Sequence, residues 1–134
     1  MKTRASGTFD VKLNSLPTSD TSAGSPLARL SIDKEFHGDL EGISKGEMLA
    51  AGTAVKGSAG YVAIERVTGT LHGQTGSFVL QHSATMARGI PQLTITVVPD
   101  SGTGELAGLT GTMMITITDG KHYYDFEYSL AGTP

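Results

Sequence analysis

Residues 112–130 read TMMITITDGKHYYDFEYSL and hold the clearest secondary-structure signal in the chain. Apolar and polar side chains alternate on both sides of Asp119-Gly120, and the apolar positions are Met113, Ile115, Ile117, Tyr124, Phe126, Tyr128 and Leu130. An alternation with a period of two is typical of β-strands with one buried face. Asp-Gly between two such runs is the strongest short-range hairpin signal. We therefore predict two antiparallel strands joined by a two-residue turn.

The same alternation recurs in other parts of the chain. Three further runs place apolar residues at every second position, namely Phe9, Val11 and Leu13, then Leu30, Ile32 and Phe36, then Leu93, Ile95 and Val97. The only candidate for a helical turn is Ser44–Ala54, and Gly46 and Gly52 weaken it because glycine disfavours a helix interior. The pattern predicts an all-β protein of seven to nine strands with at most a single helical turn.

Segments rich in turn-forming residues separate the predicted strands. The three longest are Asn14–Pro26, Leu49–Gly60 and Ser83–Pro91, and we interpret each as a loop. Turns or modest loops can then join all neighbouring strands, which makes an up-and-down meander the simplest topology. Closing that sheet removes its edges. We expect one domain over residues 1–134, a closed antiparallel barrel of about eight strands whose interior holds side chains or one small ligand.

A short glycine repeat occurs three times. The motif G-x-L-x-G is found at residues 38–42, 69–73 and 104–108, and glycine makes up 18 of the 134 residues. We interpret each copy as a strand with glycine bends, which let a barrel curl and close. A phosphate-binding loop would place its glycines between a strand and a helix, and the sequence predicts no helix after any copy.

Composition narrows the classes of function. The chain has no cysteine, a formal net charge of -3, and basic residues that are scattered rather than gathered in a stripe. A nucleic-acid-binding protein typically shows such a stripe, so we expect no nucleic-acid partner. The apolar runs are far shorter than a membrane-spanning helix needs, and the first residues lack the apolar core of a secretory signal. We expect a cytoplasmic protein with no membrane partner.

Glu65 is the first candidate site residue. In the run Tyr61–Val67 it shares one strand face with Tyr61 and Ala63, whereas Val62 and Ile64 share the other. A carboxyl group among apolar neighbours can have a raised pKa and donate or accept a proton in a pocket. The alternative is a surface glutamate paired with a lysine or arginine of a neighbouring strand. Tyr61 could line the same pocket or fill the core.

Two histidines and a second glutamate are further candidates. His82 continues the apolar face of Phe78 and Leu80, and His122 opens the face that Tyr124 continues. Either could be a base in a pocket or a satisfied histidine at a strand end. Glu105 could point into the barrel mouth or accept hydrogen bonds from a turn. The histidines match no metal-binding spacing, so we expect no metal and no cofactor.

Three segments of the chain resemble a bacterial protein family. They are GYVAIER at residues 60–66, GSFVLQH at residues 76–82 and VPDSGTGEL at residues 98–106, and the resemblance runs from about Gly7 to Leu130. The family is domain-of-unknown-function family 3224, which looks like part of the allene oxide cyclase-like barrel group. The resemblance implies an eight-stranded antiparallel barrel with a central cavity, in a homo-oligomer, a dimer or a trimer. Allene oxide cyclases rearrange hydrophobic substrates without a cofactor, and we carry none of their catalytic residues over to this chain.

Three hypotheses for function follow. The chain could be a cofactor-independent isomerase or cyclase that acts on a small hydrophobic substrate in the barrel. It could instead bind such a molecule without converting it, or be a packed barrel that acts through its surface, with Val62 and Ile64 in a subunit interface. We favour a small-molecule barrel, leave open whether it is catalytic, and expect its ligand-binding residues to be Tyr61, Glu65, His82, Glu105 and His122.

Overall fold

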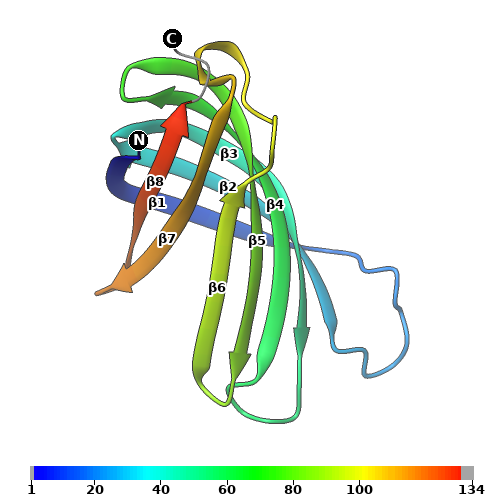
Figure 1. The fold of residues 1–134 in the computed structure, drawn as a ribbon. Coiled ribbons are helices and arrows are strands. Elements are labelled where there is room, and N and C mark those ends of the chain that lie inside the picture. Colours follow the sequence, from blue (N-terminus) through cyan, green and yellow to red (C-terminus); the bar gives the residue numbers. More distant parts are fainter. Residues whose placement is uncertain (1, 131–134) are drawn as a thin grey trace.

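The computed structural model describes residues 2–130, which form a closed barrel of eight antiparallel strands (Figure 1). Each strand pairs with the next along the chain, and β8 returns to pair with β1. The predicted all-β closed barrel with at most one helical turn is confirmed. The elements are β1 (Thr3–Leu16), β2 (Leu27–Gly38), β3 (Leu40–Gly52), β4 (Ala59–Leu71), β5 (Gln74–Ala87), β6 (Ile90–Val97), the 3-10 turn η1 (Gly104–Leu106), β7 (Leu109–Thr118) and β8 (Lys121–Leu130).

Three hairpins turn on two residues with positive φ. The φ angles are 53° and 77° at Asp119-Gly120, and the pairs His72-Gly73 and Arg88-Gly89 adopt the same left-handed conformations. Such turns match the right-handed twist of the strands that they join. The hairpin predicted at Asp119-Gly120 is therefore confirmed, with Thr118 paired to Lys121.

The strands are longer than the sequence predicts. The loop expected over Ser83–Pro91 is wrong, because β5 continues to Ala87 and only Arg88 and Gly89 separate it from β6. The other two predicted loops shorten to residues 17–26 and 53–58. The helical turn considered for Ser44–Ala54 is also wrong, since most of that segment belongs to β3. Pairing with β2 and β4 on either side satisfies its backbone and outweighs the weak local preference.

The three G-x-L-x-G copies lie at one end of the barrel. They form the connections β2–β3, β4–β5 and β6–β7, and the central leucine of each copy is fully buried: Leu40, Leu71 and Leu106. We call this the closed end; it is the upper end in Figure 1. The third copy forms η1, so the prediction of a strand in every copy is wrong there. The opposite end, where β1–β2, β3–β4, β5–β6 and β7–β8 are joined, is called the open end.

Glycines of the repeat let neighbouring strands approach closely. Gly42 and Gly69, from the first and second copies, are direct cross-strand partners. A Cβ atom on Gly69 would lie 2.1 Å from the carbonyl oxygen of Glu41 and 2.6 Å from the Cα of Gly42. Because both of those atoms belong to the backbone, a side chain here would push the strands apart. Below these glycines the interior is filled by aromatic rings, with Phe78 stacked on Phe126 at 5.8 Å between centroids.

The described residues contain no helix of the length and apolar character that crossing a membrane would require.

Substituting Gly69 tests the close approach. We expect Gly69→Ala to lower the free energy of unfolding by about 1–3 kcal/mol, the usual cost of an overpacked site. Gly52→Ala is the matched control, because nothing lies within 4 Å of a Cβ built on Gly52. Its effect should stay within about 0.5 kcal/mol. Urea unfolding followed by circular dichroism measures both, and equal values for the two variants would contradict the interpretation.

Candidate functional site

A buried cluster of four polar side chains spans β2 to β5 inside the barrel. Glu65 of β4 is fully buried, and both of its carboxylate oxygens accept hydrogen bonds. Ser44 Oγ donates to Oε1 at 2.7 Å, and Lys34 Nζ donates to Oε2 at 2.8 Å. His82 Nε2 also lies on Oε2, at 2.5 Å. We call Lys34, Ser44, Glu65 and His82 the Glu65 cluster.

Strand register brings these residues together. Lys34 shares the inward face of β2 with Ile32 and Phe36, and it pairs directly with Ser44 on β3. Glu65 pairs with Gly46, which lies two residues after Ser44 on the same face of β3. A Cβ atom on Gly46 would lie 2.6 Å from the Cα of Glu65 and 2.0 Å from the carbonyl oxygen of Ile64. Glycine opposite Glu65 therefore lets β3 and β4 close up at the point where the carboxylate needs its partners.

The surroundings of Glu65 keep it ionised. Burial alone raises the pKa of Glu65, but the hydrogen bond from His82 and the charge of Lys34 outweigh burial and lower the pKa to about 2. The raised pKa considered from the sequence is therefore wrong. Glu65 pairs with a lysine, as in the alternative, but the pair is buried and not at the surface, and Lys34 lies two strands away. An ionised carboxylate only accepts hydrogen bonds, so His82 Nε2 carries a hydrogen. In neutral His82 the lone pair is then on Nδ1.

Aromatic rings flank the cation of the cluster. Lys34 Nζ lies 4.7 Å from the ring centroid of Phe9 and 5.8 Å from that of Phe36. Such rings attract a cation through their negative faces, most strongly where water is excluded. The lysine side chain is buried, so these rings and Glu65 replace its hydration.

An apolar cavity lies at the open end. Its volume is about 760 Å³, and its walls come from β3 to β6, the loop of residues 53–58 and Ile117 of β7. β6 and β7 pair only at Thr96 and Thr112, and Figure 1 shows them diverging towards this end. Among the residues that the structure describes, Lys56 is the only charged one in the cavity lining, and the others include Met48, Ala50, Ala84, Met86 and Leu93.

Tyr61 connects the cavity to the Glu65 cluster. It is half-buried in the cavity wall, and its ring centroid lies 6.4 Å from that of His82. Ala84, its cross-strand partner, also lines the cavity, and His82 is the next inward-facing residue of β5 beyond Ala84. Burial raises the pKa of Tyr61, and the charge of Glu65 adds to this effect. The side chain is therefore a neutral hydroxyl at neutral pH.

The other two predicted residues lie apart from this group. His122 is half-buried on β8, and its ring packs on Phe9 at 5.1 Å between centroids. Glu105 is exposed at the closed end, where its Oε1 accepts a hydrogen bond from the backbone N–H of Thr75 at 2.9 Å. Glu105 does accept a backbone hydrogen bond, but from Thr75 of β5 and not from its own turn at residues 101–105 as the sequence suggested. The structure thus brings together Tyr61, Glu65 and His82 of the five predicted residues.

Lys34 and Ser44 belong to the cluster but are missing from the sequence prediction. A signal for Lys34 was present, because the lysine keeps the two-residue period between Ile32 and Phe36. A charged residue in phase with buried neighbours indicates a buried partner of opposite charge. Ser44 has no comparable signal, since a serine fits either face of a strand.

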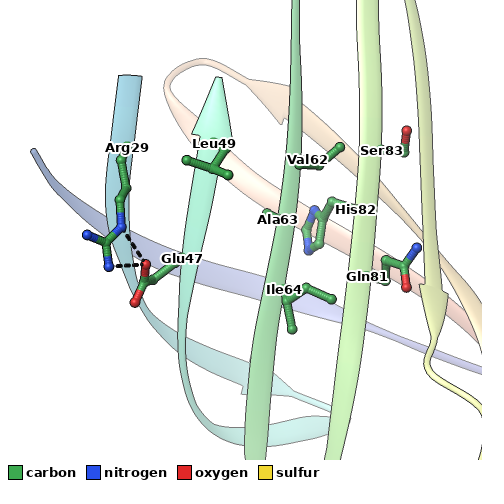
Figure 2. Close-up of a pocket in the computed structure, with 9 residues that line it drawn as sticks. All are labelled: Arg29, Glu47, Leu49, Val62, Ala63, Ile64, Gln81, His82 and Ser83. Carbon is green, nitrogen blue, oxygen red and sulfur yellow. Dashed lines mark hydrogen bonds and ion pairs between the residues drawn. The ribbon is translucent and has the colours of Figure 1, made fainter. Parts of the chain in front are cut away.

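A second pocket lies on the outer face of the sheet. It has a volume of about 490 Å³ and contains Leu49, Val62 and Ile64. Figure 2 shows these three side chains between the ion pair of Arg29 with Glu47 on one side and Gln81 with Ser83 on the other. Ala63 and His82 also line this pocket, so one member of the Glu65 cluster borders it.

Within residues 2–130, no three or more histidine, aspartate and glutamate side chains are grouped so that they could hold a metal ion.

Removing the charge of Glu65 should be costly. We expect Glu65→Gln to lower the free energy of unfolding by about 3–5 kcal/mol, because Lys34 would remain buried without a counter-charge. The double variant Lys34→Met/Glu65→Leu should lose less, since it removes both charges. Asp33→Asn, which breaks the exposed pair with Lys45, is the control and should cost within about 1 kcal/mol. A Glu65→Gln value as small as the control would contradict a buried ion pair.

The lowered pKa of Glu65 predicts a particular dependence of stability on pH. The folded-state pKa of about 2 lies below the ordinary value of 4.5, so the stabilisation is complete above about 4.5 and disappears as the pH falls towards 2. From this group alone the loss should be about 3 kcal/mol. Urea unfolding at several pH values measures it. The Lys34→Met/Glu65→Leu variant should lack this part of the fall, and an identical fall in both proteins would contradict it.

Comparison with known proteins agrees with the fold. A family described as "Protein of unknown function (DUF3224)" matches residues 5–128. The crystal structure of a protein of unknown function from that family, from Shewanella oneidensis MR-1 at 1.84 Å resolution, has a TM-score of 0.95 and 51% sequence identity, over 99% of this chain and 100% of that one. The comparison with curated proteins gave no match. The grouping with allene oxide cyclase-like barrels stays a prediction, whereas the chain belongs to the DUF3224 family.

Proposed function

We propose that this protein binds a small, mostly apolar molecule in the cavity at the open end. The observation that carries the proposal is the cavity itself, whose volume of about 760 Å³ lies within the range typical of small-molecule sites. Its walls are mainly aliphatic and backbone atoms, and a ligand would gain about 25 cal/mol for each Å² of apolar surface that leaves water.

Tyr61 supplies the polar anchor of the proposed site. Its hydroxyl has no hydrogen-bond partner among residues 2–130, whereas every fully buried polar side-chain atom in that range has one. The hydroxyl therefore retains contact with open space, and Tyr61 lines the cavity. A neutral O–H group in an apolar wall favours a ligand that carries an acceptor such as a carbonyl oxygen.

The charges around the cavity further restrict the class of ligand that can bind. Within residues 2–130, Lys56 is the one charged residue of the lining, and no carboxylate of that range lines the cavity. A cationic ligand would therefore leave water without gaining a counter-charge, which is unfavourable. The charge of the lining therefore favours uncharged ligands, or ligands whose negative group stays at the mouth of the cavity near Lys56. The expected dimer or trimer and the expected cytoplasmic location stay predictions.

A fluorescent probe can test binding in the cavity. N-phenyl-1-naphthylamine, an uncharged dye that brightens in apolar surroundings, should bind the wild-type protein with 1:1 stoichiometry. Ala84→Phe should weaken its binding at least about tenfold, because the new ring occupies the cavity. Ser83→Phe is the matched control, since the neighbouring residue lies on the outer face. Absence of dye binding, or equal affinities for both variants, would contradict the proposal.

A further inference from the structure

Exposed apolar side chains surround the mouth of the cavity at the open end. Ile90, which begins β6, is 69% exposed, and Ile117, near the end of β7, is 64% exposed. These are the most exposed large apolar side chains among the described residues. Val55, in the β3–β4 loop, is also exposed, and both Val55 and Ile117 line the cavity. Apolar residues grouped around one opening, rather than scattered singly, indicate a contact surface.

Hydrogen bonds hold two of these segments together. The backbone N–H of Gly89 donates to the carbonyl oxygen of Gly57, and the backbone N–H of Arg88 donates to Ser58 Oγ, both at 2.9 Å. The β3–β4 loop and the β5–β6 turn therefore form one continuous edge, and Figure 1 shows them side by side at the lower end of the barrel. A surface that contacts this edge does not have to order it first, which lowers the cost of binding.

Basic residues accompany the exposed apolar ones. Lys56 lies in the β3–β4 loop, Arg88 in the β5–β6 turn, and Lys121 is the first residue of β8. None of the three forms an ion pair with another described residue. Asp119, in the β7–β8 turn, is the one carboxylate of these three connections. We call the apolar and basic residues together the rim: Val55, Lys56, Arg88, Ile90, Ile117 and Lys121.

The closed end has the opposite charge. Its connections hold Asp39, Asp100 and Glu105 and, over their described residues, no lysine or arginine. The fourth connection of the open end, residues 17–26, adds Asp20, whose carboxylate accepts hydrogen bonds from side chains of its own loop. A negatively charged surface would therefore attract the mouth of the cavity and repel the closed end.

We propose that the rim docks on the surface of a lipid bilayer that carries anionic head groups. Apolar side chains gain free energy when they leave water at the boundary of head groups and acyl chains, and basic residues beside them are attracted to the anionic lipids. A bilayer thus accounts for both kinds of residue in the rim. A second copy of this chain would instead bring three basic residues against three basic residues, which is unfavourable.

Docking in this orientation turns the mouth of the cavity towards the acyl chains. An apolar ligand then passes from the bilayer into the cavity without crossing water. This consequence rests on the proposed function, whereas docking itself depends only on the rim. The prediction of no membrane partner concerned a spanning helix, and docking needs only side chains at the surface.

Flotation with lipid vesicles tests docking. The probes are vesicles of equal parts phosphatidylserine and phosphatidylcholine, and vesicles of phosphatidylcholine alone. We expect the wild-type protein to float with the anionic vesicles at low salt and to be released as sodium chloride is added, because salt screens the attraction. Ile90→Ser should lower the partition coefficient at least about fivefold through lost apolar contact. Lys56→Gln should lower it about fivefold, the usual contribution of one basic residue.

Each variant has a matched control on the outer face of the barrel. Met114→Ser also replaces an exposed apolar side chain, and Lys45→Gln also removes one positive charge. Both controls should bind the anionic vesicles as the wild type does. Absence of flotation with anionic vesicles, or equal losses in a rim variant and its control, would overturn the proposal. A dimer in sedimentation without vesicles that Ile90→Ser abolishes would assign the rim to a second copy and also overturn it.

A fluorescent label can report whether the rim enters the bilayer. The chain has no cysteine, so Ile90→Cys and Met114→Cys each accept one nitrobenzoxadiazole label. Its emission should shift to the blue with anionic vesicles at position 90 and stay unchanged at position 114. Equal shifts at both positions, or none at position 90, would overturn the proposal. The dye experiment on the cavity is done without vesicles, so its failure with flotation intact would overturn the proposed function alone.

Discussion

The interior of this barrel is organised around one ionised carboxylate that has no contact with water. Burying such a charge costs several kcal/mol unless partners replace the lost hydration. Three side chains from three different strands replace it for Glu65, and a glycine on β3 leaves the strands close enough for them to do so. The contacts of Glu65 therefore depend on the pairing register of β2 to β5. A slip by one residue would turn these groups outward and leave apolar groups in their place.

The two ends of the barrel follow from different local chemistry. At the closed end, three buried leucines within the glycine repeat complete a core of stacked aromatic rings. At the open end, β6 and β7 are joined by a single pair of partners, and the cavity lies among β3 to β6, the loop of residues 53–58 and Ile117 of β7. The Glu65 cluster and Tyr61 lie between these two halves. Tyr61 lies next to His82 of the cluster and lines the cavity where the packed core ends.

Local sequence signals predicted the fold and about half of the site. Alternation around Asp119-Gly120 predicts strands and a turn from neighbouring residues alone, and closure into a barrel follows from the need to pair every edge. Glu65 and His82 were predicted because each continues an apolar face. The state of Glu65 was not, since its pKa depends on Lys34, which is distant in sequence and adjacent only after β2, β3 and β4 pair. The contact of Glu105 was not predicted either, because its partner Thr75 lies 30 residues away in sequence and becomes a neighbour only in the folded barrel.

The alternation of connections between the ends has an evolutionary consequence. Every buried leucine of the repeat lies in a closed-end connection, so inserting residues there would displace the core. The segments 17–26 and 53–58 of the open end carry no core side chain and are largely exposed. Surface segments of this kind accept changes in length at little cost in stability. Related barrels can therefore differ in the loops around the cavity, and so in the ligands that can enter it. The closed end and the Glu65 cluster are expected to stay constant.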